Sequence, residues 1–198
     1  MTPLNRSTVH DLLQRPAMAA GVLMFLASMA VLLAALLALA APADANARTH
    51  RSVEHHADGS TTAHTGVARS GPNGAVLRGR AATTDGRGSG SVTSRAAAVG
   101  AQGGVAARQG STTRSVDGSA SHSGTVSAQN AQGSLHSSGG ASRNADGSVE
   151  QARSTTATSA ATGNSVQTQS SYSKDSGLSR SATCYDASGT AMACPTRP

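Results

Sequence analysis

The sequence predicts a mainly β or partly disordered chain, in which an N-terminal apolar helix precedes a low-complexity β-hairpin repeat without a conventional core. Three observations support this fold class. The chain of 198 residues has no Trp and a single Phe. A long uncharged apolar run lies near its N-terminus. Through the remainder, turn-forming pairs that contain Gly recur with a period of about 15 residues, which is typical of repeat architectures.

The composition of residues 44–198 excludes a close-packed globule. This part contains ten Val and three Leu but no Ile, Phe or Trp. Val and Leu together make up about 8% of it, well below the roughly 20% of large aliphatic and Phe residues at which folding around a core becomes difficult. Each such side chain contributes about 1.5–3 kcal/mol when buried. Ordering each residue costs about 1–2 kcal/mol, so burial cannot offset the ordering of this segment.

The first element is an apolar segment that directs export, within residues 1–43. Arg6 and Arg15 precede it against a single Asp11, and residues 17–41 then carry no charge. Positive charge ahead of an apolar run keeps the N-terminus inside the cytoplasm, so the following chain is translocated. We therefore expect residues 44–198 to work outside the cytoplasm.

Two interpretations of this segment remain open. Small residues at alternate positions follow the apolar run, at Ala41, Ala43, Ala45 and Ala47, and fit three overlapping small-x-small sites for signal peptidase. A cleaved signal peptide is therefore favoured. The alternative is an uncleaved signal anchor, because a helix over residues 17–41 would extend about 37 Å and could cross a bilayer.

The second element, residues 44–178, is a Gly, Ser, Thr and Ala-rich turn repeat. Its Asp-Gly and Asn-Gly pairs favour two-residue hairpin turns, in which both central residues have positive φ. The stretches between turns would be strands of a long antiparallel meander, one strand per repeat, solvated on both faces and weakly specified in register. Two alternative states remain for this segment. It is either disordered, or it becomes ordered only by stacking with other copies of the chain. The pairs include Asp58-Gly59, Asn73-Gly74, Asp85-Gly86, Gln102-Gly103, Asp117-Gly118, Gln132-Gly133 and Asp146-Gly147.

The third element, residues 179–198, is a C-terminal hairpin. It contains the only two cysteines, Cys184 and Cys194, and Ser188-Gly189 falls between them. In an oxidising compartment a disulfide is the expected state of such a pair. Closing a loop of this size constrains the unfolded chain by about 2.5–3 kcal/mol.

No pattern in the sequence indicates catalysis, a cofactor site or a metal site. Gly86-Arg87-Gly88-Ser89-Gly90 has glycines around a serine but no strand–turn–helix context for a nucleophile. A chain without a core offers no water-poor site for preorganised groups, so we expect no enzyme. The histidine-rich stretch is interpreted as solvated polar chain, with divalent-metal binding as the minor alternative. It comprises His50, His55, His56 and His64, with Glu54 and Asp58 between them.

Arginines recur through the repeats and give residues 44–198 an excess of positive charge. Thirteen Arg and one Lys face nine acidic residues there. Arg forms fork-like contacts with phosphate, sulfate and carboxylate, so a salt-sensitive contact with anionic envelope polymers is one interpretation. The other is that thinly spread Arg keeps the repeat soluble and protects strand edges. Because aromatic stacking residues are scarce, we expect no specific nucleic-acid site. The repeat arginines are Arg69, Arg78, Arg80, Arg87, Arg95, Arg108, Arg114, Arg143, Arg153 and Arg180.

Four features of the sequence together carry a resemblance to a known group of proteins. They are the export signal, the Gly-Pro-Asn-Gly turn at 71–74, the Asp-Gly-Ser turns at 58–60, 117–119 and 146–148, and the terminal Cys-Tyr-Asp…Ala-Cys-Pro. In these features the chain resembles repetitive secreted proteins of proteobacteria. The resemblance covers most of residues 44–198 and rests on turn residues. It implies secretion, and it carries over no catalytic or binding residue. A fainter similarity is to curli-type fibre subunits, which also use polar β repeats.

These observations predict an exported envelope or secreted repeat protein with a structural or interaction role. It would reside in the periplasm, at the cell surface or in the medium, or stay anchored in the inner membrane by its N-terminal segment. Its partners would be other copies of itself or anionic envelope polymers. The two alternative functions are a weak binder of anionic surface polymers through the repeat arginines and a self-assembling extracellular fibre subunit.

Overall fold

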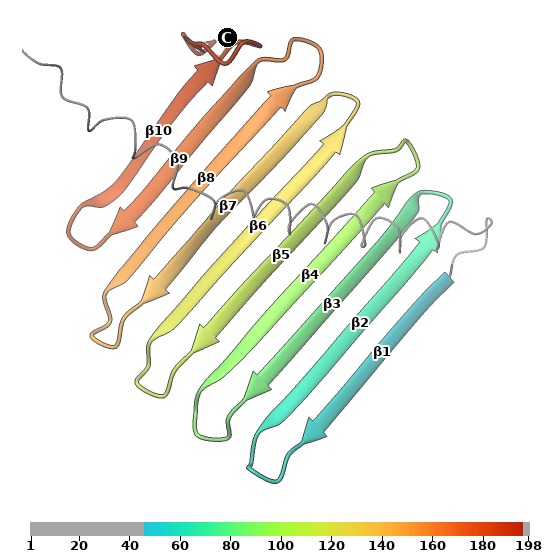
Figure 1. The fold of residues 1–198 in the computed structure, drawn as a ribbon, viewed down its shortest axis with the longest axis vertical. Helices are drawn as coiled ribbons and strands as arrows, with labels where there is room; N and C mark the ends of the chain where they lie inside the picture. The colour runs from blue at the N-terminus through green and yellow to red at the C-terminus, as the bar shows by residue number, and fades with distance from the viewer. Residues whose placement is uncertain (1–45, 196–198) are drawn as a thin grey trace, which may run out of the picture. The chain divides into compact units, whose positions relative to one another are not determined.

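The computed structural model describes residues 46–195, which form one antiparallel β-sheet of eleven strands (Figure 1). Strand order in the sheet follows strand order in the sequence, so every connection is a hairpin. The strands are β1 (Asn46–His55), β2 (Thr61–Gly71), β3 (Gly74–Thr84), β4 (Gly90–Gly100), β5 (Val105–Arg114), β6 (Ala120–Asn130), β7 (Gly133–Arg143), β8 (Val149–Ser159), β9 (Ser165–Ser173), β10 (Gly177–Tyr185) and β11 (Ala191–Met192).

The meander places one strand in each sequence repeat, which confirms the prediction of a β-hairpin repeat. Ten of the strands are 9–11 residues long, and only β11 is shorter. Among the described residues no stretch of helix interrupts the sheet. The alternative of a disordered repeat is therefore not what residues 46–195 adopt.

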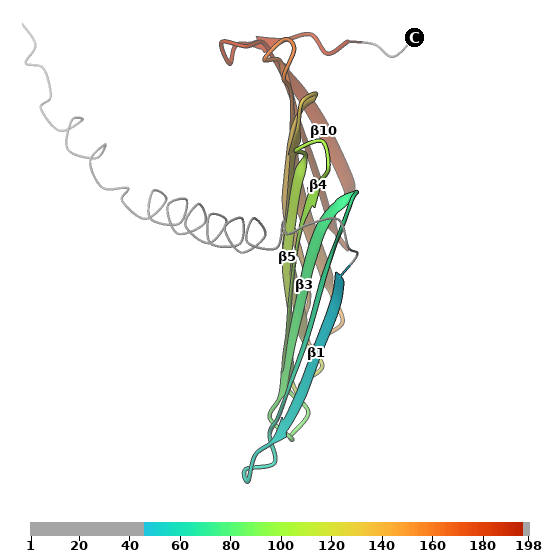
Figure 2. The same ribbon diagram turned by 90° about the vertical axis from the view of Figure 1, so that its right-hand side faces the viewer.

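The sheet is a single twisted layer, as the edge-on view shows (Figure 2). Within residues 46–195, only Ala97, Ser137 and Cys184 are buried, and no large side chain is fully enclosed. Stability must therefore come from the backbone ladders and from contacts between side chains on neighbouring strands. Both faces of the sheet meet solvent, as the sequence indicates.

Hydroxyl pairs on directly opposed residues help to fix the register. Thr83 and Ser91 share a hydrogen bond of 2.7 Å between β3 and β4. Thr113 and Ser121 do the same at 2.6 Å between β5 and β6, and Ser137 and Thr155 at 2.8 Å between β7 and β8. Such cross-strand pairs supply register specificity that an apolar pattern would otherwise provide.

Two-residue loops occur between Gly71 and Gly74 and between Asn130 and Gly133, but the prediction that both central residues have positive φ is wrong. Among the described residues only glycines have positive φ. In the first turn, the N–H of His56 bonds to the carbonyl of Ser60, the N–H of Gly59 bonds to the carbonyl of His56, and Gly59 alone is left-handed with φ of 84°. This is a three-residue hairpin loop, in which Asp58 keeps an ordinary backbone conformation.

Asp is favoured in these turns because its carboxylate accepts backbone N–H groups. The N–H of Ser119 bonds to Oδ1 of Asp117 at 2.9 Å, and the N–H of Ser148 bonds to Oδ1 of Asp146 at 2.8 Å. The side chain thus mimics part of a backbone turn, which explains the recurrent Asp-Gly-Ser sequence without requiring positive φ at Asp.

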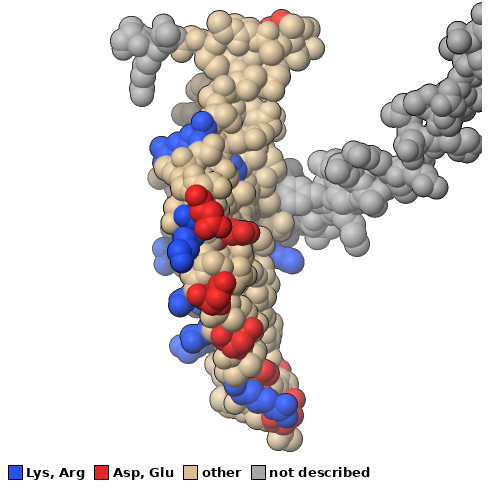
Figure 3. All heavy atoms as spheres, turned by 90° about the vertical axis from the view of Figure 1, so that its left-hand side faces the viewer, with Lys and Arg blue, Asp and Glu red and all other residues tan. Residues whose placement is uncertain are grey.

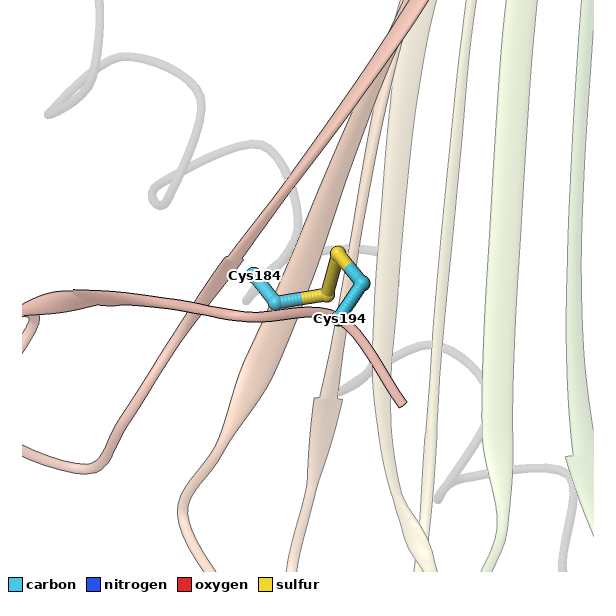
Figure 4. Close-up of a disulfide and its surroundings, with 2 residues drawn as sticks. All are labelled: Cys184 and Cys194. Atoms are coloured by element: carbon cyan, nitrogen blue, oxygen red, sulfur yellow. A yellow bond between two sulfur atoms is a disulfide. The ribbon is translucent and has the colours of Figure 1, made fainter. Parts of the chain in front are cut away.

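At the C-terminal end, β10 pairs with β9 along all of Gly177–Tyr185, so the hairpin of residues 179–198 continues the repeat sheet. Its turn forms between Asp186 and Thr190, where Gly189 has φ of 84°. Cys184 and Cys194 form a disulfide with Cα atoms 5.2 Å apart, in agreement with the expected hairpin (Figure 4). The bridge holds the short β11, which pairs with β10 at two positions.

The predicted N-terminal helix of residues 1–43 and the small residues Ala41, Ala43 and Ala45 lie outside the described residues. Ala47 lies in β1, opposite Arg69. No helix within residues 46–195 is long and apolar enough to span a bilayer.

Candidate binding face

The register of the sheet sorts the arginines by face. Directly opposed residues of antiparallel strands project to the same side, and neighbours along a strand project to opposite sides. Following the pairs from β1 to β10 places nine strand arginines on one side, called here the arginine face. They are Arg51, Arg69, Arg78, Arg80, Arg108, Arg114, Arg143, Arg153 and Arg180.

The opposite side, called here the hydroxyl face, carries Arg48 and Arg95 only, together with most of the strand Ser and the Gln of β5, β6 and β9. The two acidic residues of the strands, Glu54 and Glu150, also lie on the hydroxyl face. The arginine face therefore has no carboxylate on any strand of residues 46–195. Sequence spacing suggests thinly spread charge, whereas alternation along the strands places nine of the eleven strand arginines on one side.

The arginines of this face are exposed. One of them is held in place: Nη1 of Arg153 donates to Oγ of Ser137 at 3.0 Å. Arg153 lies directly opposite Gly139, and Gly124 and Gly110 continue the same row of opposed residues on β6 and β5. This row contributes no side chains of its own between Arg153 and Ser94, and the His122 imidazole lies 3.6 Å from the positions that Cβ atoms at Gly110 and Gly124 would occupy.

The large apolar side chains that remain exposed on the strands also lie on the arginine face. By the same register the hydroxyl face carries Leu77, Val99 and Val105, all of which are half-buried. One further exposed apolar residue, Val116, is in a turn. The exposed strand residues of the arginine face are Val53, Val126, Leu135, Val149, Tyr172, Leu178 and Met192.

Most acidic side chains of the described residues lie at one set of strand ends, called here the acidic edge, whereas Asp186 lies in the turn between β10 and β11 at the opposite strand ends. Asp58, Asp85, Asp117, Asp146 and Asp175 all lie in the turns that join odd-numbered strands to the following even-numbered strand. Figure 3 shows this row of acidic side chains along the edge, with most of the basic side chains projecting to one side of it. Most carboxylates are thus collected at one set of strand ends, whereas the strand arginines are distributed along the arginine face, with Arg114 and Arg143 next to acidic turns.

Hydrogen bonds lower the pKa of the carboxyl groups in these turns. The hydroxyl and then the N–H of Ser119 lower the pKa of Asp117, and Ser148 lowers that of Asp146 in the same way. Ser60 has this effect on the pKa of Asp58. For Asp85 the N–H of Arg87 is the largest cause of the lowered pKa. These four carboxylates therefore stay ionised at neutral pH.

The histidine-rich stretch does not form a compact site. His50 and His64 lie on the hydroxyl face, whereas His55 lies on the arginine face, where its Nδ1 is 3.0 Å from Oγ1 of Thr61. His56 is in the first turn, with its Nε2 3.5 Å from Oγ1 of Thr62. In the part of the chain that the structure describes, no three His, Cys, Asp or Glu side chains come together as a group that could hold a metal ion.

The glycine-rich segment 86–90 forms the turn between β3 and β4. Ser89 donates its N–H to Oδ1 of Asp85 and accepts the N–H of Val116 at Oγ, at 3.0 and 3.2 Å. Ser89 therefore links two neighbouring turns, and its hydroxyl is already engaged.

Comparison with protein-family models, with curated proteins and with solved structures found no match for this chain. The arrangement itself is an open surface. It offers an array of guanidinium groups with apolar side chains between them, which suits contact with an extended anionic surface or polymer.

Proposed function

We propose that this chain is an exported repeat protein with an interaction role outside the cytoplasm, and that its arginine face binds an anionic partner of the cell envelope. The observation that supports the proposal is the placement of nine exposed arginines on one face without a strand carboxylate among them. Export is inferred from the N-terminal apolar segment, and the Cys184–Cys194 bridge is compatible with it.

The spacing of the charges suits a partner with repeated anionic groups. Neighbouring strands lie about 4.8 Å apart, so β1 to β10 present guanidinium groups over roughly 45 Å. Arg78 and Arg80 on β3 and Arg108 on β5 occupy the middle of the strands, where no turn obstructs them. Salt ions could replace the partner at each arginine, so the affinity for the anionic partner should be modest and sensitive to salt.

The test is binding of dextran sulfate to the full chain, measured by calorimetry over a range of salt concentrations. We compare Arg78→Gln/Arg108→Gln with Arg48→Gln/Arg95→Gln, which removes the same charge from the hydroxyl face. The first pair should weaken binding and reduce the slope of log affinity against log salt by about two. The control pair should leave the slope near that of the unchanged chain. An equal effect of the two pairs would contradict the proposal.

Self-assembly into a fibre is the second candidate, because β1 leaves one long side of its backbone without a neighbouring strand among residues 46–195. The row of opposed residues that begins at Arg51 ends at Arg180. Adding β10 of one copy to β1 of the next in the same rows would therefore oppose two arginines, which is unfavourable. A monomeric mass across a dilution series by light scattering would exclude the fibre.

A further inference from the structure

We propose that the anionic partner of the arginine face is the phosphate-bearing surface of a lipid bilayer; the inference rests on the proposed function and names its partner. The observation behind it is that the arginine face is also the face with the exposed apolar strand residues. A soluble polyanion would contact the guanidinium groups and gain nothing from exposed Val and Leu.

Most apolar residues of the arginine face lie in two rows that run across the strands, on either side of the central arginines. Val126 and Val149 lie instead in rows that contain arginines. One row contains Val76, Leu135 and Val166, with alanines between them, and ends at Cys184 and Met192. The other contains Val53, Val92, Tyr172 and Leu178, with the polar residues Thr112, His122 and Gln151 between Val92 and Tyr172. The rows of Arg78 and Arg108, and of Arg80 and Arg153, lie between them.

The exposed fraction of the large apolar side chains is higher on the arginine face than on the hydroxyl face, and packing within the sheet does not require this difference. Leu178 is 59% exposed, Val53 45% and Tyr172 42%, all on the arginine face. Both sides of a single-layer sheet meet solvent, so solvent contact does not explain why the exposed apolar side chains lie on one side. Their concentration on the arginine face indicates an external partner. Arginine stems cover apolar surface while the guanidinium reaches outward, so this face can place side chains at the acyl boundary and charges at the phosphates.

A hollow of about 410 Å³ also lies over the arginine face. Its lining includes Ala98, Ala106, Ala128 and Leu135, with Gln129 and Asn130 on one side. These residues belong to the first apolar row, near the edge opposite the acidic turns. The acidic edge would stand at the rim of the contact, where its carboxylates remain in water.

Charge decides against a second copy as the occupant. Two arginine faces would oppose nine positive charges each, and the hydroxyl face carries Arg48 and Arg95 against Glu54 and Glu150, so it offers no complementary charge. Single-stranded nucleic acid needs stacking side chains, and Tyr172 is the only aromatic residue on the arginine face of the described sheet.

The absence of Trp from the chain allows a direct test of which face meets lipid. The full chain is reconstituted with vesicles of phosphatidylcholine alone or mixed with phosphatidylglycerol, carrying Tyr172→Trp on the arginine face or Leu77→Trp on the hydroxyl face. Any contribution of the N-terminal apolar segment is common to both variants. With phosphatidylglycerol present, the Tyr172→Trp emission should shift to shorter wavelength and be quenched by lipids brominated in the acyl chain. The Leu77→Trp emission should stay unchanged.

A second test removes apolar side chains from the arginine face without changing its charge. Val53→Thr/Val126→Thr keeps the shape and strand preference of two exposed side chains on the arginine face, and Val99→Thr/Val105→Thr is the matched pair on the hydroxyl face. The first pair should reduce vesicle binding several-fold but leave dextran sulfate binding unchanged. Circular dichroism verifies that each variant retains the sheet.

The outcomes separate this inference from the proposed function. Quenching confined to Tyr172→Trp, together with sensitivity to the first Val pair, would support a bilayer partner. Equal quenching of both Trp probes, or none with dextran sulfate binding intact, would overturn the lipid inference and leave the arginine face as a polyanion site. If neither vesicles nor dextran sulfate bind, both the inference and the proposed function are wrong.

Discussion

Arg153 and Ser137 are joined by a hydrogen bond of 3.0 Å that crosses from β8 to β7 beside a glycine. Gly139 is directly opposite Arg153, and a Cβ placed there would lie 2.6 Å from the carbonyl oxygen of Ala152 and 3.0 Å from Cβ of Arg153. The absence of a side chain at 139 therefore permits the close approach of β7 and β8 that brings Ser137 under the Arg153 side chain.

Gly139→Val should consequently destabilise the sheet by about 1–3 kcal/mol, because the new side chain meets backbone that cannot move aside easily. Gly79→Val is the matched control, since a Cβ at position 79 has nothing within 4 Å. The control should be neutral or stabilising by up to about 1 kcal/mol, because Val favours strands. Urea denaturation measures both, and equal destabilisation by the two changes would contradict the account of Gly139.

Acid should weaken the turns. The lowered pKa of Asp117 and of Asp146 means that their contribution to stability is complete above the unfolded-state pKa of about 3.9 and is lost as pH falls through the lower folded-state pKa. Asp117→Asn/Asp146→Asn keeps the acceptor oxygen without the titration. The loss of stability of this variant between neutral and acid pH, measured by urea denaturation followed by circular dichroism, should therefore be smaller than that of the unchanged chain. Glu54→Gln/Glu150→Gln removes the same charge from the strands and is the control for a general effect of charge.

Reduction of the Cys184–Cys194 bridge should release the C-terminal hairpin and leave most of the sheet in place. The bridge closes a loop with a sequence separation of 10, worth about 2.5–3 kcal/mol on the loop-entropy model. Hydrogen exchange by mass spectrometry should show lost protection in β11 and the end of β10. Loss of protection in β2–β5 would show instead that the bridge supports the entire sheet.

Signal cleavage should fall before β1. Cleavage after Ala43 or Ala45 leaves Asn46–His55 complete, whereas cleavage after Ala47 removes the residue that pairs with Arg69. The N-terminus of the exported protein should therefore be Asp44 or Asn46, as determined by intact mass. A mature chain that begins at Arg48 would contradict this prediction, and one that retains Met1 would establish the signal anchor.

Much of the fold could be predicted because it depends on local signals. Each turn-forming pair that contains Gly, Gln-Gly and Ser-Gly included, marks a chain reversal whatever its exact turn type, and the number of such pairs gives the number of strands. The turn type itself was not predictable from the dipeptide, because the N–H groups that Asp117 and Asp146 accept are compatible with more than one loop length.

The arginine face could not be recognised by reading the repeats one at a time. Whether Arg108 and Arg153 share a side depends on the number of residues in each intervening turn, since one extra residue would move every later side chain to the other face. The turns differ in length, from the two residues between Gly71 and Gly74 to the longer loop between Ser159 and Asn164. Only the complete register combines these lengths into one assignment.

From β1 to β10 the turns alternate between acidic and neutral, and this alternation has a consequence for how such a chain could lengthen or shorten. Each strand pairs only with its neighbours in sequence, as in other linear repeat arrays. Loss of a single strand would reverse the direction of all that follow and transfer their aspartates to the opposite edge. Loss or duplication of a whole hairpin, roughly 30 residues, would preserve the direction of the later strands, the edge at which their turns lie and the face to which their side chains project. The repeating unit of this sheet is therefore the hairpin of two strands. Homologous variants should accordingly differ in their number of strands by even numbers.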